Sequence, residues 1–219
     1  MSRFDTRSGI EIRIGQIRLQ GDLTVPRPAS GVVLFAHGSG SSRHSPRNRH
    51  VARHLQQAGL ATLLMDLLTL EEEATDALTA HLRFDIRLLA DRLTQSADWV
   101  ASQPDLRDLR LGLFGASTGA AAALVSAAER TKLVRAVVSR GGRPDLASPA
   151  LPTVQAPTLL IVGGNDGPVI AMNREAMQEL CCEMRLEIIP GASHLFEEPG
   201  ALDKVAQLAC QWFLQYLAP

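Results

Sequence analysis

The chain has 219 residues, of which 46% are hydrophobic and 21% are charged. This composition is typical of a globular protein with a sizeable buried core and argues against disorder. The 22 basic and 23 acidic side chains nearly cancel, so no overall field attracts nucleic acid or an anionic membrane. We therefore expect one domain over residues 1–219 that binds neither.

The ends of the chain and its cysteines bear on the cellular compartment. The stretch Met1 to Gly9 is polar and lacks the apolar segment of a secretory signal. No apolar run approaches the ~18 residues that span a bilayer. Cys181, Cys182 and Cys210 cannot all pair, and they have no zinc-type spacing. We expect a cytoplasmic protein with free thiols.

The first regular pattern runs from Glu11 to Val25, where apolar and polar residues alternate. The alternation, interrupted by Gly15 and Gly21, predicts an antiparallel hairpin. From Gly31 onward, continuous apolar runs alternate with helical patterns, which predicts a parallel sheet covered by helices on both faces. The predicted strands are Val32–Ala36, Ala61–Met65, Leu109–Phe114, Val134–Ser139, Pro157–Val162 and Met184–Ile189.

Caps and apolar stripes place the helices. Ser45 is the predicted N-cap of a helix that ends before Gly59. Apolar stripes predict two further helices, one from Leu82 to Val100 and one from Leu202 to Tyr216. The acidic run from Glu71 to Asp76 suits the start of a helix, where carboxylates meet the positive end of the dipole. A flap formed by residues 67–80 is a second interpretation of that run.

A short glycine-flanked motif follows the predicted strand Leu109 to Phe114. Residues 115–119 read G-x-S-x-G, with Ser117 in the centre. A serine on so sharp a strand-to-helix turn projects its hydroxyl above the sheet, and the glycines let strand and helix approach closely. The alternative interpretation is a plain turn with a capping serine.

A serine nucleophile needs a base, and the base needs an orienting acid. Asp166 follows the predicted strand ending at Val162, and His194 follows the one ending at Ile189. Both therefore leave the carboxyl edge of a parallel sheet, where open α/β sheets assemble their sites. The chain order Ser, Asp, His is that of α/β-hydrolases. These features predict a triad of Ser117, Asp166 and His194.

The loop from His37 to Gly40 follows the first predicted parallel strand. Attack on a carbonyl creates an oxyanion, and we expect the backbone N–H groups of Thr118 and Ser39 to stabilise it. A phosphate cradle is the alternative, but no Lys-Ser/Thr pair and no full dinucleotide glycine pattern occurs here. We therefore expect no cofactor.

Ser117, Asp166, His194 and the loop from His37 to Gly40 resemble those of dienelactone hydrolase-like α/β-hydrolases. The resemblance covers nearly the whole chain. It implies a sheet of seven or eight strands with the second strand antiparallel, little or no lid, and ester hydrolysis through an acyl-enzyme. True dienelactone hydrolases carry cysteine at the nucleophile position, so Ser117 resembles the carboxylesterase branch.

Four segments are also similar to a hydrolase module that some bacteria fuse to a phosphoribosyltransferase domain. They are His37–Asn48, Asp66–Glu73, Arg83–Ile86 and His194–Gly200.

His50 and His54 have the i, i+4 spacing that can hold a metal on one helix face. No glutamate lies between them, and His54 lies beside the apolar positions Val51 and Leu55. We therefore interpret both as packed or surface histidines and assign no metal.

Several arginines lie near the same sheet edge. Arg49 and Arg53 are interpreted as a solvated helix face. Arg43, Arg47 and Arg140 are close to strand ends, and guanidinium groups there could bind a carboxylate or phosphate. They predict a substrate that carries an anionic group.

These features together predict a serine hydrolase that cleaves a small-molecule carboxylic ester or lactone. A thioesterase or acyltransferase with the same triad is the nearest alternative, and a non-catalytic binding homologue is a remote one. Because the base is a histidine, activity is expected to fall as the pH drops through about 6 to 7.

Overall fold

The computed structural model describes residues 3–218, so Met1, Ser2 and Pro219 lie outside the described part of the predicted domain. It contains an eight-stranded sheet in the order β1-β2-β4-β3-β5-β6-β7-β8. Strand β2 is antiparallel to its neighbours β1 and β4, and all other neighbouring pairs are parallel. The predicted α/β-hydrolase fold, with its N-terminal antiparallel hairpin and antiparallel second strand, is confirmed.

The bounds of the elements are as follows. The strands are β1 Phe4–Ile14, β2 Ile17–Pro26, β3 Gly31–Ala36, β4 Leu60–Met65, β5 Leu111–Ala116, β6 Val134–Arg140, β7 Thr158–Gly163 and β8 Met184–Ile189. The α-helices are α1 Pro46–Gln57, α2 Leu70–Thr79, α3 Ile86–Ser102, α4 Thr118–Glu129, α5 Gly167–Glu179 and α6 Ala201–Leu217. Two 3₁₀ segments are η1 Leu82–Phe84 and η2 Pro144–Thr153.

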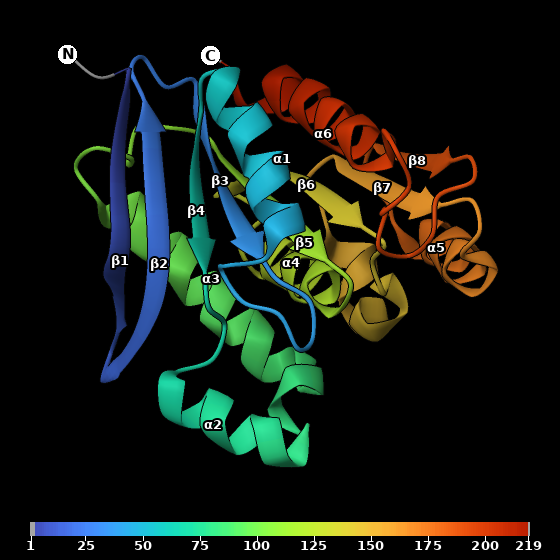
Figure 1. Ribbon diagram of the computed structural model, residues 1–219, viewed down its shortest axis with the longest axis horizontal. Helices are drawn as coiled ribbons and strands as arrows, with labels where there is room; N and C mark the ends of the chain where they lie inside the picture. Colours follow the sequence, from blue (N-terminus) through green and yellow to red (C-terminus); the bar gives the residue numbers. More distant parts are fainter. Residues whose placement is uncertain (1–2, 219) are drawn as a thin grey trace.

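The continuous apolar strands are explained by two cores, one on each face of the sheet. In β3, Val32 and Leu34 belong to the core shared with α3 and α4, whereas Val33 and Phe35 belong to the core shared with α1 and α6. Figure 1 shows these two pairs of helices on opposite faces. Side chains alternate across a strand, so a strand buried on both faces needs apolar residues at every position.

The hairpin is longer than its sequence pattern predicts. Strand β1 begins at Phe4 instead of Glu11, and its register with β2 shifts between Arg7 and Ile10. The first half of β1 therefore lacks a regular alternation in the sequence. The register shift interrupts it, and many side chains of this edge strand are exposed. The turn itself is two residues long, with Gly15 at a φ of 59°, a value that glycine adopts without strain.

The predicted helix over Leu82 to Val100 is wrong at its start. Asp85 interrupts it, because its side chain accepts a hydrogen bond from the N–H of Leu88 at 3.0 Å and caps α3. The preceding residues form the separate segment η1. Across residues 3–218, no helix has both the length and the apolarity needed to cross a membrane.

Candidate active site

Ser117 is the residue between β5 and α4. Its φ of 51° and ψ of −120° are a strained conformation for a residue with a side chain. A Cβ added at Gly115 would lie 2.4 Å from the Cα of Ala120, and one at Gly119 would lie 2.4 Å from the carbonyl oxygen of Ala36. Both positions of the motif therefore exclude a side chain, so only glycine fits the tight turn that carries Ser117.

Asp166 and His194 are held together by contacts between their two loops. The N–H of Gly164 donates to the carbonyl of Ile189 at 2.8 Å, and the N–H of Asn165 donates to that of Ala192 at 2.9 Å. Nδ1 of His194 lies 2.6 Å from Oδ2 of Asp166. The carboxylate therefore fixes the tautomer with hydrogen on Nδ1 and leaves Nε2 free to accept a proton.

Ser117 and His194 line one hollow of about 230 Å³. Gly141 lies against the ring of His194, since a Cβ there would be 3.5 Å from ring atoms. Among residues 3–218, no side-chain hydrogen bond joins Ser117 to His194. Such bonds are often long in free hydrolases and tighten when substrate binds.

The loop after β3 forms a tight turn beside Ser117. The N–H of Ser41 donates to the carbonyl of Gly38 at 3.2 Å, and Gly40 has a φ of 66°. The N–H of Ser39, a central residue of this turn, takes no part in the turn hydrogen bond. The N–H of Thr118 opens α4 and has no partner within the helix. The two predicted oxyanion donors therefore lie on segments that meet at Ser117, where a Cβ on Gly38 would be 3.1 Å from the serine Cβ.

His37 shapes this turn, a role that the sequence did not reveal. Its Nε2 accepts a hydrogen bond from the N–H of Leu67 at 3.1 Å, and its Nδ1 donates to the carbonyl of Gly38 at 3.0 Å. Burial lowers the pKa of His37, so the ring is neutral, as accepting at Nε2 requires. The ring thereby ties the end of β4 to the turn.

Arg140 ends β6 and is only 7% exposed, in the same hollow as Ser117. Its Nη2 donates to Oδ1 of Asn48 at 3.5 Å, and its guanidinium carbon lies 5.9 Å from the ring centre of Phe196. Burial, followed by the charge of Arg47, lowers the pKa of Arg140 to about 10, so the side chain remains cationic at neutral pH. Within residues 3–218, no carboxylate forms an ion pair with it.

Arg47 and Arg43 differ in the carboxylates that pair with them. Arg47 lines the hollow and contacts Glu197 at 3.4 Å on its exposed side. Arg43 points away, into an ion pair with Asp66 and a 3.7 Å contact with Asp22. The structure thus brings Arg47 and Arg140 to Ser117, whereas carboxylates hold Arg43.

Two residues around Arg140 were missed by sequence reasoning. Asn48 is buried in the first turn of α1, where Ser45 caps the helix as predicted. Phe196 is buried with a φ of 57° just after His194. Neither residue type signals a site alone, and only the capping pattern that begins α1 could have placed Asn48 near the loop.

A second hollow of about 290 Å³ lies across the turn that Gly38, Ser39 and Ser41 share with the first. Its lining includes three carboxylates, those of Asp66, Glu73 and Asp76, together with the guanidinium-bearing Arg83 and with Thr118.

The acidic run forms the first turn of α2, as predicted, with a capping box between Thr69 and Glu72. Salt bridges of 2.6 Å from Arg92 to Glu72 and from Arg83 to Asp76 anchor this helix. The interpretation of residues 67–80 as a flap stays a prediction.

The glycine contacts give a test of how the turn is held. A methyl group at Gly119 would collide with backbone, whereas one at Gly167, in the first turn of α5, would meet nothing within 4 Å. We expect Gly119→Ala to lower the free energy of unfolding by about 3 kcal/mol and Gly167→Ala to change it by less than about 1 kcal/mol. Urea-induced unfolding measures both, and equal effects would contradict this view of the turn.

Comparisons with known proteins identify the family and the fold of the chain. The profile of the dienelactone hydrolase family matches residues 20–217. A crystal structure of dienelactone hydrolase from Anabaena variabilis ATCC 29413 is 62% identical, covers 99% of this chain and 100% of its own, and superposes with a TM-score of 0.97. The structure of Est1E from Butyrivibrio proteoclasticus is 14% identical, with coverages of 95% and 98% and a TM-score of 0.80, and it shows the shared fold alone.

A Mycobacterium tuberculosis H37Rv protein named as a phosphoribosyl transferase is 56% identical over 208 residues. The match covers 95% of this chain and 46% of that protein, so the chain spans about half the length of this relative.

Proposed function

The chain belongs to the dienelactone hydrolase family and is a hydrolase, and from this premise we propose that it cleaves a small carboxylic ester or lactone with Ser117 as nucleophile. The observation that carries the proposal is the shared hollow of Ser117 and His194, together with the 2.6 Å contact between His194 and Asp166. A hydroxyl, an imidazole and a partly buried carboxylate in this order are what acyl transfer requires.

The proposed reaction has two halves. Nε2 of His194 takes the proton of the Ser117 hydroxyl as its oxygen attacks the substrate carbonyl, and Asp166 stabilises the imidazolium. The N–H groups of Thr118 and Ser39 stabilise the tetrahedral oxyanion. His194 then gives the proton to the leaving alcohol, which yields the acyl-enzyme. Water, deprotonated by the same histidine, releases the acid and restores Ser117.

Ser117→Ala tests this proposal. We expect it to lower kcat/KM for an activated ester by about 10⁴-fold or more and to abolish labelling by a fluorophosphonate probe. Ser41→Ala is the matched control, because Ser41 lines the same hollow but takes no part in the reaction. Labelling that persists in Ser117→Ala would refute the assignment. Rates on a panel of ester, lactone and thioester substrates would show which of these bonds the protein hydrolyses.

Arg140 supports a further part of the proposal, that the substrate carries an anionic group. A cation 93% removed from solvent without a carboxylate partner is costly, and Arg140 is such a cation, with its Nε atom buried and unpaired. A substrate carboxylate or phosphate entering the hollow would meet this group and Arg47 and could form charge-assisted hydrogen bonds with both.

The arginine proposal predicts discrimination between substrates. We expect Arg140→Gln to lower kcat/KM for a carboxylate-bearing ester by about 30-fold or more, since losing one partner of a buried charge pair costs at least about 2 kcal/mol. A neutral ester of equal size should lose much less. Arg53→Gln, at an exposed position of α1, is the control. Equal losses on both esters would contradict an anion-binding role.

A further inference from the structure

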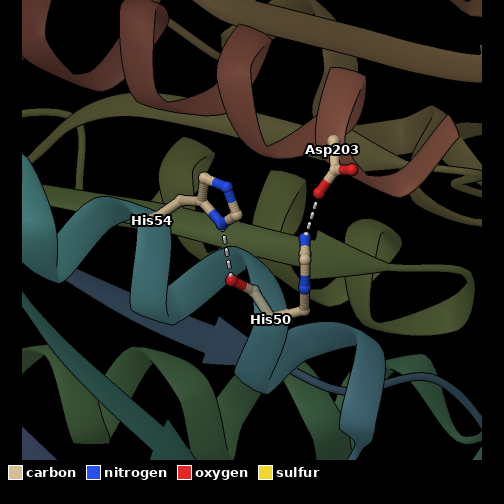
Figure 2. Close-up of side chains that lie close together, drawn as sticks. All are labelled: His50, His54 and Asp203. Atoms are coloured by element: carbon tan, nitrogen blue, oxygen red, sulfur yellow. Dashed lines mark hydrogen bonds and ion pairs between the residues drawn. The ribbon is translucent and has the colours of Figure 1, made fainter. Parts of the chain in front are cut away.

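Three potential metal ligands meet between α1 and α6, and none of them lines the hollow with Ser117. His50 and His54 come from α1, and Asp203 comes from the first turn of α6 (Figure 2). One ligand atom from each residue lies within 4.8 Å of the others. Nε2 of His50 is 2.8 Å from Oδ1 of Asp203, and the two imidazole centres are 4.7 Å apart.

The fold holds these ligands on opposed helices. Residues four apart lie on one helix face, so both histidines of α1 face the same neighbour. Val51 and Leu55 of α1 share a buried core with Val205 of α6, which fixes the two helices against each other. Asp203 is 153 positions from His50 in the chain, and for that reason the histidine pair alone gave no sign of a third ligand.

The hydrogen bonds of His54 suit a metal ligand. Its Nδ1 lies 3.1 Å from the carbonyl oxygen of His50, to which it donates, and Figure 2 shows this bond directing the ring. With the proton held on Nδ1, the lone pair is on Nε2. A backbone carbonyl that fixes the tautomer of a histidine in this way is the usual outer partner of a metal-binding imidazole.

We propose that His50, His54 and Asp203 bind a divalent transition metal ion of the Zn²⁺ type that links α1 to α6. Two imidazoles and one carboxylate favour such ions over Mg²⁺ or Ca²⁺. Tetrahedral ligands of zinc are about 3.4 Å apart, so rotation of side chains that are 30% and 66% exposed, those of His50 and Asp203, completes the site. Water takes the remaining position.

One of the linked helices, α1, lines the hollow that contains Ser117. The first turn of α1 contributes Arg47 and Asn48 to that hollow, and α6 follows the loop that carries His194. A bound ion would therefore hold α1, which lines the hollow, against the start of α6. The binding itself does not depend on the proposed ester hydrolysis.

Calorimetric titration of ZnCl₂ into the chelator-treated, desalted full chain tests the proposal. We expect one equivalent to bind, and His50→Ala and Asp203→Asn each to weaken binding by about tenfold or more, at least the loss that follows removal of an outer partner. Asp203 is 66% exposed, so its substitution leaves folding intact. His81→Ala removes an exposed histidine elsewhere and should bind as the wild type does.

Two further readouts distinguish metal binding at this site from metal binding by other residues, such as the cysteines. Zn²⁺ should raise the Tm of the wild type and of His81→Ala but not of Asp203→Asn. Co²⁺ should give a visible spectrum without the near-ultraviolet charge-transfer band of a bound thiolate. Unchanged affinity in both His50→Ala and Asp203→Asn, absence of binding to the wild type, or a thiolate band that reports the cysteines would each overturn the proposal.

Discussion

The close backbone contact between the start of α4 and the ends of β3 and β5 is the constraint on which the site depends. A side chain at Gly119 would collide with the carbonyl oxygens of Ala36 and His37, so the sharp turn before α4 requires glycine at this position. Ser117 adopts the positive φ of that turn at a cost of about 1–3 kcal/mol. The alanines from Ala120 to Ala123 are fully buried, and their packing offsets this strain.

The same turn of Gly38 to Ser41 that carries a proposed oxyanion donor also separates charge. On one side lie Arg47 and Arg140 with Ser117, and on the other lie three carboxylates, including that of Asp66, together with Arg83. Under the proposed function, an anionic substrate group is attracted to the first side, whereas on the second side Arg43 and Arg83 are already paired with Asp66 and Asp76. The burial of Arg140 strengthens this attraction, because a charge acts over a longer range where water is excluded.

Much of this arrangement could be predicted from sequence because it follows from strand ends. The continuous apolar runs located the parallel strands, and the residues after three of them, Ser117, Asp166 and His194, share one edge. What sequence could not supply depends on contacts between distant elements. The hydrogen bond of His37 to Leu67 and the approach of Asp203 to His50 arise only when strands and helices pack. The start of α3 was misplaced because the apolar stripe continues past the capping residue Asp85.

Trapping of the acyl-enzyme tests the central claim most directly. The protein is mixed with a slowly hydrolysed ester, quenched with acid within the first turnover, and digested for mass spectrometry. The account predicts that the acyl mass is added to the peptide containing Ser117, and that it disappears on longer incubation. An adduct on another residue would contradict the account. Turnover of the ester without any adduct on Ser117, under conditions where deacylation limits the rate, would contradict it as well.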